Sequence, residues 1–272
     1  MKRIKIVLSI VSVVVLLAVG IVAQVALARH RPGDAPVVQE SFVAALGGFR
    51  SLAAEFVWFR ADRLQDEGRF GELVQLTSLL TALEPHDAEV WNYASWNLAY
   101  NISARIPRPE DRWRWVYAGV QLLRDEGLKW NPSEPRLYFE LADRFEMKIG
   151  TDRFDPDALL YQLEWARIVE DAARTGDWNR IAMDPAKMAE VEALYRDAEV
   201  TPRADGTYPE AELAYRSTGR LDWRNPQASA MYWAHLGLRH ASGQMRLLLA
   251  QKIALARQLY GSPNRQPEEA LP

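Results

Sequence analysis

The chain has 272 residues, of which 49% are hydrophobic and 25% charged, and it contains no cysteine. The lack of cysteine excludes disulfides, thiolate nucleophiles and cysteine-ligated metals. Residues 1–32 hold five Lys or Arg and no Asp or Glu, so the rest of the chain carries 28 basic and 36 acidic side chains, a net charge of −8 with neutral histidine. That sign argues against general affinity for nucleic acid or anionic lipid.

Residues 6–28 form an uninterrupted apolar run in which only two serines and one glutamine are polar. As a helix the run would measure roughly 34 Å, enough to cross a hydrocarbon core of about 30 Å. We therefore predict a transmembrane anchor over residues 1–30. Its spanning residues include Ile6, Leu16, Leu17, Ile21 and Leu27.

The charges that flank the run predict its orientation. Three basic side chains and the terminal amine precede it and two arginines follow it, so the N-terminus is expected in the cytoplasm. The helical domain would then be extracytoplasmic, or periplasmic, beside an inner (cell) membrane. Ala26-Leu27-Ala28 also suits a signal peptidase site, and cleavage there would leave a soluble exported protein.

Apolar residues recur at helical spacing through most of the remaining chain, and no stretch alternates with the period of a strand. The sequence therefore predicts an all-α fold after a linker and lead-in segment over residues 31–48. The expected helices cover residues 49–69, 73–83, 88–103, 111–130, 136–148, 157–174, 184–199, 228–241 and 244–260, and Asn225-Pro226 is expected to begin a helix. Residues 261–272, with three prolines, are expected to form a flexible tail.

Several of these segments carry a recurring pattern. Gly68-Arg69-Phe70 would join two helices, and Pro85 and Pro132 each close a pair of helices. The pattern resembles the tetratricopeptide repeat over residues 49–174, with additional helices over 175–260. The small position of the family's first helix is occupied by Ala61, Ser95 and Ala142.

The repeat departs from the family in length. Pro85 and Pro132 are 47 residues apart, whereas a regular unit has about 34. We expect the additional residues, about 13 by that comparison, to enlarge the turn over residues 106–115.

The resemblance implies a stack of helical hairpins (a solenoid) whose first helices line a concave groove. The residues that would face this groove and bind a partner are Trp58, Asp62, Asp66, Asn92, Trp96, Tyr100, Phe139, Asp143 and Glu146. Such a groove is aromatic and acidic, so it suits an apolar segment flanked by Lys or Arg. Trp58 and Phe139 stand where a carboxylate clamp would need cations, which excludes that clamp.

Two alternatives stay open for these surface residues. Trp58, Trp96 and Phe139 would be buried if residues 37–46 or the C-terminal helices covered the groove. A second group, Arg105, Arg108, Arg112 and Trp113, could contact lipid headgroups beside the anchor. The favoured interpretation of this second group is a solvated turn with tryptophans that pack between helices.

No Gly-rich phosphate loop, Gly-x-Ser-x-Gly elbow or His-Glu-x-x-His helix occurs in the sequence, and we expect no metal and no cofactor. The sequence thus favours a non-catalytic, membrane-anchored adaptor that binds a protein partner and helps to assemble a membrane-associated complex, with no nucleic acid as ligand. The alternatives are an exported glycan- or peptidoglycan-binding protein and, less favoured, a two-carboxylate helical glycosidase.

Overall fold

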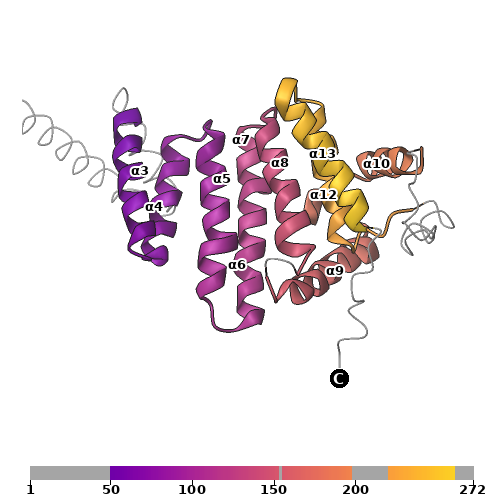
Figure 1. Ribbon diagram of the computed structural model, residues 1–272, viewed down its shortest axis with the longest axis horizontal. Helices are drawn as coiled ribbons and strands as arrows, with labels where there is room; N and C mark the ends of the chain where they lie inside the picture. Colours follow the sequence, from indigo (N-terminus) through magenta and orange to yellow (C-terminus); the bar gives the residue numbers. More distant parts are fainter. Residues whose placement is uncertain (1–49, 153–154, 198–219, 261–272) are drawn as a thin grey trace, which may run out of the picture. The chain divides into compact units, whose positions relative to one another are not determined.

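The computed structural model describes residues 50–152, 155–197 and 220–260, and every regular element in these ranges is a helix (Figure 1). The predicted all-α fold is confirmed for this part of the chain. No helix within it is both long and apolar enough to span a bilayer. The expected anchor with Ile6, Leu16, Leu17, Ile21 and Leu27, the linker and the tail all lie outside the described residues.

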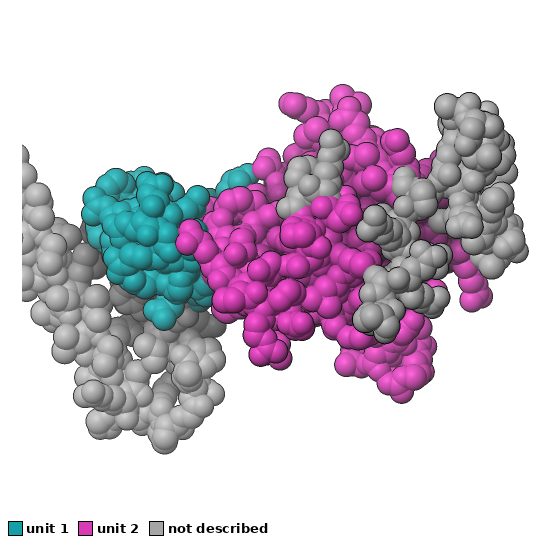
Figure 2. All heavy atoms as spheres, turned by 60° about the horizontal axis from the view of Figure 1, so that its bottom comes forward, with its two compact units in different colours: residues 1–90 teal, residues 91–272 magenta. Residues whose placement is uncertain are grey.

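The helices agree with the predicted segments to within a few residues at most ends. In the first part of the chain they are α3 (Arg50–Asp66), α4 (Phe70–Leu83), α5 (Ala88–Trp96), η2 (Asn97–Ile102), η3 (Ser103–Arg105), α6 (Pro109–Gln121), η4 (Leu122–Gly127) and α7 (Leu128–Trp130). The remaining ones are α8 (Pro135–Asp143), η5 (Arg144–Ile149), α9 (Ala158–Thr175), η6 (Trp178–Ile181), α10 (Pro185–Asp197), α12 (Pro226–Leu238) and α13 (Gly243–Tyr260). The chain divides into two compact units, Met1–Val90 (unit 1) and Trp91–Pro272 (unit 2), which Figure 2 colours separately.

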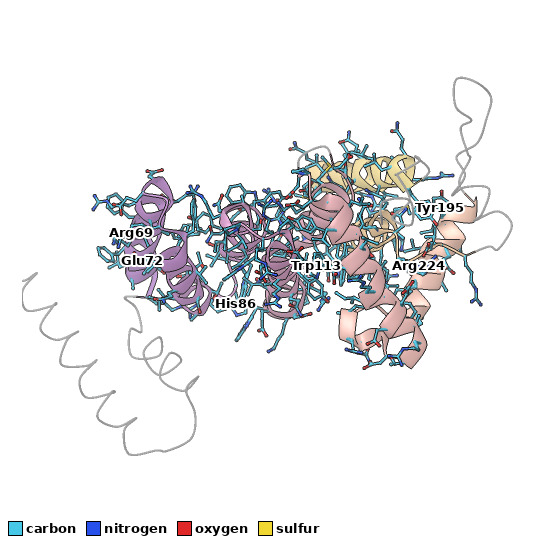
Figure 3. The ribbon with its side chains drawn as sticks, turned by 90° about the horizontal axis from the view of Figure 1, so that it is seen from below. Arg69, Glu72, His86, Trp113, Tyr195 and Arg224 are labelled. Carbon is cyan, nitrogen blue, oxygen red and sulfur yellow. The ribbon has the colours of Figure 1, made fainter. Side chains whose placement is uncertain are left out.

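The described part of unit 1 contains the hairpin of α3 and α4, which turns at Gly68. This glycine has a φ of 68°, a left-handed conformation that lacks the steric penalty of a Cβ atom. Arg69 closes the turn, because its backbone N–H donates to the Leu64 oxygen at 2.9 Å and its guanidinium binds Glu72 at 2.6 Å (Figure 3). Between them the helices bury Ala54, Val57, Ala61, Leu64, Leu73, Leu80 and Leu83.

In unit 2 successive helices pack against one another (Figure 1). The α5–η2 helix packs on α6, α8 and η5 pack on α12, and α12 packs on α13, while α9 contacts both α6 and η5. The small residues Ser95 and Ala142 are fully buried, as their place in the repeat pattern predicts. A Cβ atom on Gly119 of α6 would lie 2.7 Å from the Ser95 oxygen, so the two helices meet at their smallest residues.

The turn between the first two helices of unit 2 is short, and the expectation of an enlarged turn at residues 106–115 is wrong. Helix α5 runs on through η2 and η3 to Arg105, and α6 starts at Pro109 and runs on through η4 and α7 to Trp130. The η2, η4 and η5 segments are π-helical, a form that takes up more residues per turn than an α-helix. The additional residues of this repeat therefore lengthen its helices rather than its turn.

Polar side chains mark where two of the helices start. The Glu134 carboxylate accepts a hydrogen bond from the Arg136 N–H at the start of α8, and the Asn225 side chain accepts one from the Gln227 N–H at the start of α12. Each helix has proline in its first turn, where the missing N–H has no effect on the hydrogen bonding. The predicted start of a helix at Asn225-Pro226 is thereby confirmed.

Candidate functional site

A group of charged and polar side chains lies inside unit 2, and most of its ion pairs and hydrogen bonds join its own members. We call it the charged cluster, and its members are Asn92, Tyr100, Glu140, Asp143, Arg144, Glu146, Lys148, Asp155, Tyr161 and Lys252. Helix η5 supplies its centre, because η5 is packed against both α9 and α12 and so buries side chains on several of its faces.

Arg144 joins two helices of the stack at the centre of this cluster. Its side chain is 1% exposed, and its guanidinium donates to Glu140 Oε2 at 3.0 Å and to Asn92 Oδ1 at 2.8 Å. The guanidinium carbon also lies 5.4 Å from the centre of the Tyr100 ring, within the range of a cation–π contact. Asn92 and Tyr100, both predicted to face the groove, are therefore held in place by a buried arginine.

Lys148 forms the second buried ion pair of the cluster. Its Nζ donates to Asp155 Oδ2 at 2.5 Å, and the Tyr161 hydroxyl donates to the same oxygen at 3.2 Å. The ammonium lies 4.9 Å from the centre of the Tyr100 ring. Burial raises the pKa of the Tyr161 hydroxyl, and the Asp155 carboxylate raises it further, so this tyrosine stays neutral.

Lys252 of α13 binds the two carboxylates that the sequence placed in the groove. Its Nζ lies 2.8 Å from Asp143 Oδ1 and 3.0 Å from Glu146 Oε1, and 5.0 Å from the centre of the Phe139 ring. Burial raises the pKa of Glu146 although Lys252 opposes that shift. Burial lowers the pKa of Lys252, but Asp143 and Glu146 outweigh it and the net shift is upward.

This contact changes what these three groove residues can do. Glu146 is fully buried, and the charge of Asp143 is already balanced by Lys252, so neither carboxylate is available to attract a basic partner. The ring of Phe139 is partly covered by the same lysine. Helix α13 thus occupies this part of the predicted groove. This matches the alternative in which the C-terminal helices cover groove residues.

Trp96 is the most exposed aromatic residue next to the cluster. Its side chain is 38% exposed, and its ring stacks on that of Tyr100 with 5.7 Å between the centroids. The Tyr100 ring also contacts the buried cations Arg144 and Lys148, which hold it in place. Among the groove residues of unit 2, Trp96 keeps a surface that a partner can contact.

The remaining predicted groove residues, Trp58, Asp62 and Asp66, lie on α3 in unit 1, beside an apolar surface that is exposed. Leu52, Phe56 and Phe59 are 61%, 71% and 63% exposed, whereas Trp58 is half-buried. Three exposed carboxylates flank them, and the guanidinium carbon of the exposed Arg63 lies 5.5 Å from the centre of the Phe59 ring. We call this surface the acidic aromatic strip, and it consists of Leu52, Glu55, Phe56, Phe59, Asp62 and Asp66.

The sequence does not predict that the strip is exposed, because α3 has apolar residues on two faces. One face packs on α4 through Ala54, Val57, Ala61 and Leu64, and Phe56 and Phe59 belong to the other. A pattern of period 3.6 does not show which of two apolar faces is buried. The available signal was the size of the residues, since small side chains at the packed face allow close approach.

The structure places Arg112 and Trp113 inside unit 2, where they are not open to the possible headgroup contact; for Trp113 this agrees with the favoured interpretation of a tryptophan that packs between helices. Arg112 donates to the Ile106 oxygen at 2.6 Å and forms an ion pair with Asp157, so it braces the turn before α6 against the start of α9. Trp113 is buried and stacks on Tyr117 at 5.2 Å (Figure 3). These two residues therefore serve packing.

The other two candidates for headgroup contact are exposed. Arg105 and Arg108 both face solvent, but the guanidinium of Arg108 lies 3.7 Å from Asp111 and 4.0 Å from Glu110. This local balance of charge leaves little net attraction for an anionic surface.

Nothing in the described ranges has the composition of a metal centre, since no three His, Asp or Glu side chains gather there as ligands. Nor does the charged cluster suit glycoside hydrolysis. Glu146 has the raised pKa of a general acid, but its carboxyl group is fully buried and bound to Lys252, out of reach of a sugar.

The described helices define an all-α protein of paired helices, with an internally paired charged cluster and an exposed acidic aromatic strip. Comparison with protein-family models, with curated proteins and with solved structures finds no significant match to this chain. The resemblance to tetratricopeptide repeats therefore stays a prediction.

Proposed function

We propose that the chain is a non-catalytic, membrane-anchored adaptor of tetratricopeptide-like helical hairpins that binds a protein partner and assists the assembly of a membrane-associated complex. The observation that carries this proposal is the acidic aromatic strip on α3. A large apolar surface that is exposed and bordered by charge is typical of a protein-binding site.

The geometry of the strip suits an anchoring role. Leu52, Phe56 and Phe59 are spaced by four and three residues, so they form one row along the helix. Aromatic side chains in such a row supply most of the binding energy in many interfaces, because they bury large area at low entropic cost.

The charges beside the row specify the partner. Glu55, Asp62 and Asp66 are exposed and form no ion pair with any other described residue. Unpaired carboxylates attract a basic segment and favour its approach. The partner segment is therefore apolar on one side with Lys or Arg at its edges, as was expected for the groove as a whole.

A second contact surface is the stacked pair of Trp96 and Tyr100 in unit 2. Its exposed tryptophan stacks on Tyr100, whose ring contacts buried cations, so binding there would cost little ordering of side chains. We propose that the Trp96–Tyr100 pair, like the strip, binds an apolar part of a protein partner.

The experiment is crosslinking of the full chain in its own membrane, followed by purification and mass spectrometry. A protein that is captured by the wild type should be lost from the double variant Phe56→Ala/Phe59→Ala, since two anchors of about 2 kcal/mol each amount to roughly a thousandfold in affinity. Leu194→Ala on α10 is the matched control, because Leu194 is also exposed and lies outside the strip.

A companion variant tests the charge requirement. Asp62→Asn/Asp66→Asn should weaken the capture and reduce its dependence on salt, since the carboxylates act through long-range attraction. The proposal fails if the chain is always recovered alone, or if the Phe56/Phe59 variant captures the same protein as well as the wild type. Retention on cell-wall material by both variants alike would instead support the glycan-binding alternative.

A further inference from the structure

Helix α13 has one exposed side that carries no charge. The residues on it are Gln244, Leu247, Ala250, Gln251, Ala254, Leu255 and Gln258, and all are exposed. Leu247 is 66% and Leu255 40% exposed. The opposite side holds the buried Leu249, Ala256 and Tyr260, and α13 packs on α12 and α8.

The spacing on this side is that of a helix–helix seam. Gln244, Gln251 and Gln258 are seven residues apart, and Leu247 and Ala254 fall between them at steps of three and four. Alternating steps of three and four keep these five uncharged residues, three of them glutamines, on one side of the helix, where they face a neighbouring helix in a paired arrangement. The two alanines allow close approach, and the leucines fill the space between the backbones.

The seam is also symmetric about its middle residue. Counting outward from Gln251, Leu247 and Leu255 stand four residues away on either side, and Gln244 and Gln258 stand seven away. A helix with such a sequence matches a second copy of itself when the copy runs in the opposite direction. This is the requirement for a two-fold interface, in which the same surface meets itself.

We propose that α13 pairs with α13 of a second copy of the chain, antiparallel and with the two-fold axis at Gln251. Leu247 of each copy packs on Leu255 of the other. The two Gln251 side chains bond to each other, because an amide both donates and accepts. Their polar contact at the centre of the seam fixes the register, as buried polar residues do in coiled coils.

The exposed side of α13 carries no charge to attract the basic segment proposed for the strip on α3. Its symmetry instead favours a second copy of the chain as the partner that binds there. A helix of 18 residues is about 27 Å long and about 10 Å wide, so a single pair buries several hundred Å² on each side. This is near the lower limit of about 1,000 Å² in total for a stable interface. The dimer is therefore weak in dilute solution and is favoured where the chains are concentrated.

Disulfide trapping tests the pairing directly, because the natural chain has no cysteine. In the full chain, Gln251→Cys places both thiols at the two-fold axis, where helices packed 8–10 Å apart bring the Cα atoms to roughly 4–6 Å, within the reach of a disulfide. Oxidation should convert most of this variant into a covalent dimer.

Gln258→Cys is the matched control, on the same exposed side. In the antiparallel pair its two copies lie about 21 Å apart along the helix and should stay monomeric, whereas an equal mixture of Gln244→Cys and Gln258→Cys chains should crosslink. Adding Leu247→Glu and Leu255→Glu to Gln251→Cys should reduce its crosslinking at least tenfold.

The proposal is overturned if Gln251→Cys stays monomeric under oxidation. Free reaction of that thiol with maleimide would then mean that no copy binds there, and protection from maleimide would mean that another part of the chain or another partner covers it. Equal crosslinking by Gln258→Cys alone would exclude the antiparallel register. None of these outcomes bears on the capture of a partner by the strip, so the two proposals fail separately.

Discussion

The guanidinium of Arg144 donates a hydrogen bond to Oδ1 of Asn92 at 2.8 Å, which connects two helices whose residues are 52 positions apart in the sequence. The same guanidinium binds Glu140 one turn earlier on its own helix. Arg144 is almost fully buried. If its guanidinium were removed, Asn92 and Glu140 would each lose a hydrogen bond at a place that water reaches poorly.

Arg144→Met should destabilise the fold by about 3 kcal/mol, since it leaves Asn92 and one oxygen of Glu140 without their donor. The change is measured as the shift of the urea midpoint followed by circular dichroism. Arg136→Met removes the other arginine bound to Glu140 and is the control, because the Arg136 side chain is 40% exposed and exposed pairs contribute about 1 kcal/mol or less. Equal effects of the two variants would show that burial of Arg144 does not matter.

Gly150→Ala should destabilise the junction of η5 and α12 by about 1–3 kcal/mol, as overpacking usually does. The new Cβ atom would lie 2.4 Å from Nε2 of Gln227, which donates to the oxygens of Glu146 and Gly150. Gly71→Ala in α4 meets no atom within 4 Å and should instead stabilise by about 0.5–1 kcal/mol. Thermal midpoints that moved in the same direction for both variants would contradict this account.

Lys252→Met should cost about 3–5 kcal/mol, because it leaves the fully buried Glu146 carboxylate without its cation. Adding Glu146→Gln removes the charge that was left unpaired, so the double variant should be more stable than Lys252→Met alone. A double-mutant cycle of urea unfolding measures this coupling. Strictly additive losses would mean that the two groups do not interact.

Stability should fall on mild acidification through His235. Burial lowers the pKa of this imidazole below 6.5, the nearby Arg239 adds to the shift, and Glu190 opposes it. A group with a lowered pKa contributes stability that is present above the unfolded value and is lost as the pH falls through the folded one. The thermal midpoint of His235→Gln should therefore depend less on pH than that of the wild type as the pH falls below about 6.5. Parallel pH profiles would show that another group is responsible.

Most of the described helices could be predicted from the sequence because their signals are local. Asn225-Pro226 marks the start of α12, and the Gly68 turn separates α3 from α4, since a capping side chain and a left-handed glycine act within a few residues. The π-helical segments could not be predicted in this way. A change of helical form depends on which neighbours the helix meets, and η5 meets α9 and α12.

In the candidate sites, too, the features with a local signal could be predicted and the contacts between distant segments could not. The sequence placed Asn92, Tyr100 and Asp143 on one inner surface, and the structure brings them into one cluster. It could not show that Lys252, more than a hundred positions from Asp143 and Glu146, supplies the cation for both. Nor could it show which apolar face of α3 packs on α4, because Phe56 and Val57 suit a core equally well by composition.

The charged cluster also bears on how the stability of the protein varies with temperature. Exposure of apolar groups on unfolding raises the heat capacity, whereas exposure of polar and charged groups lowers it. Unit 2 releases both kinds of group when it unfolds, since Arg144, Glu146 and Lys148 are buried beside Phe145 and Ile149. Its heat-capacity change should therefore be smaller than that of an equally large apolar core, and its stability curve should be flatter from cold to warm conditions.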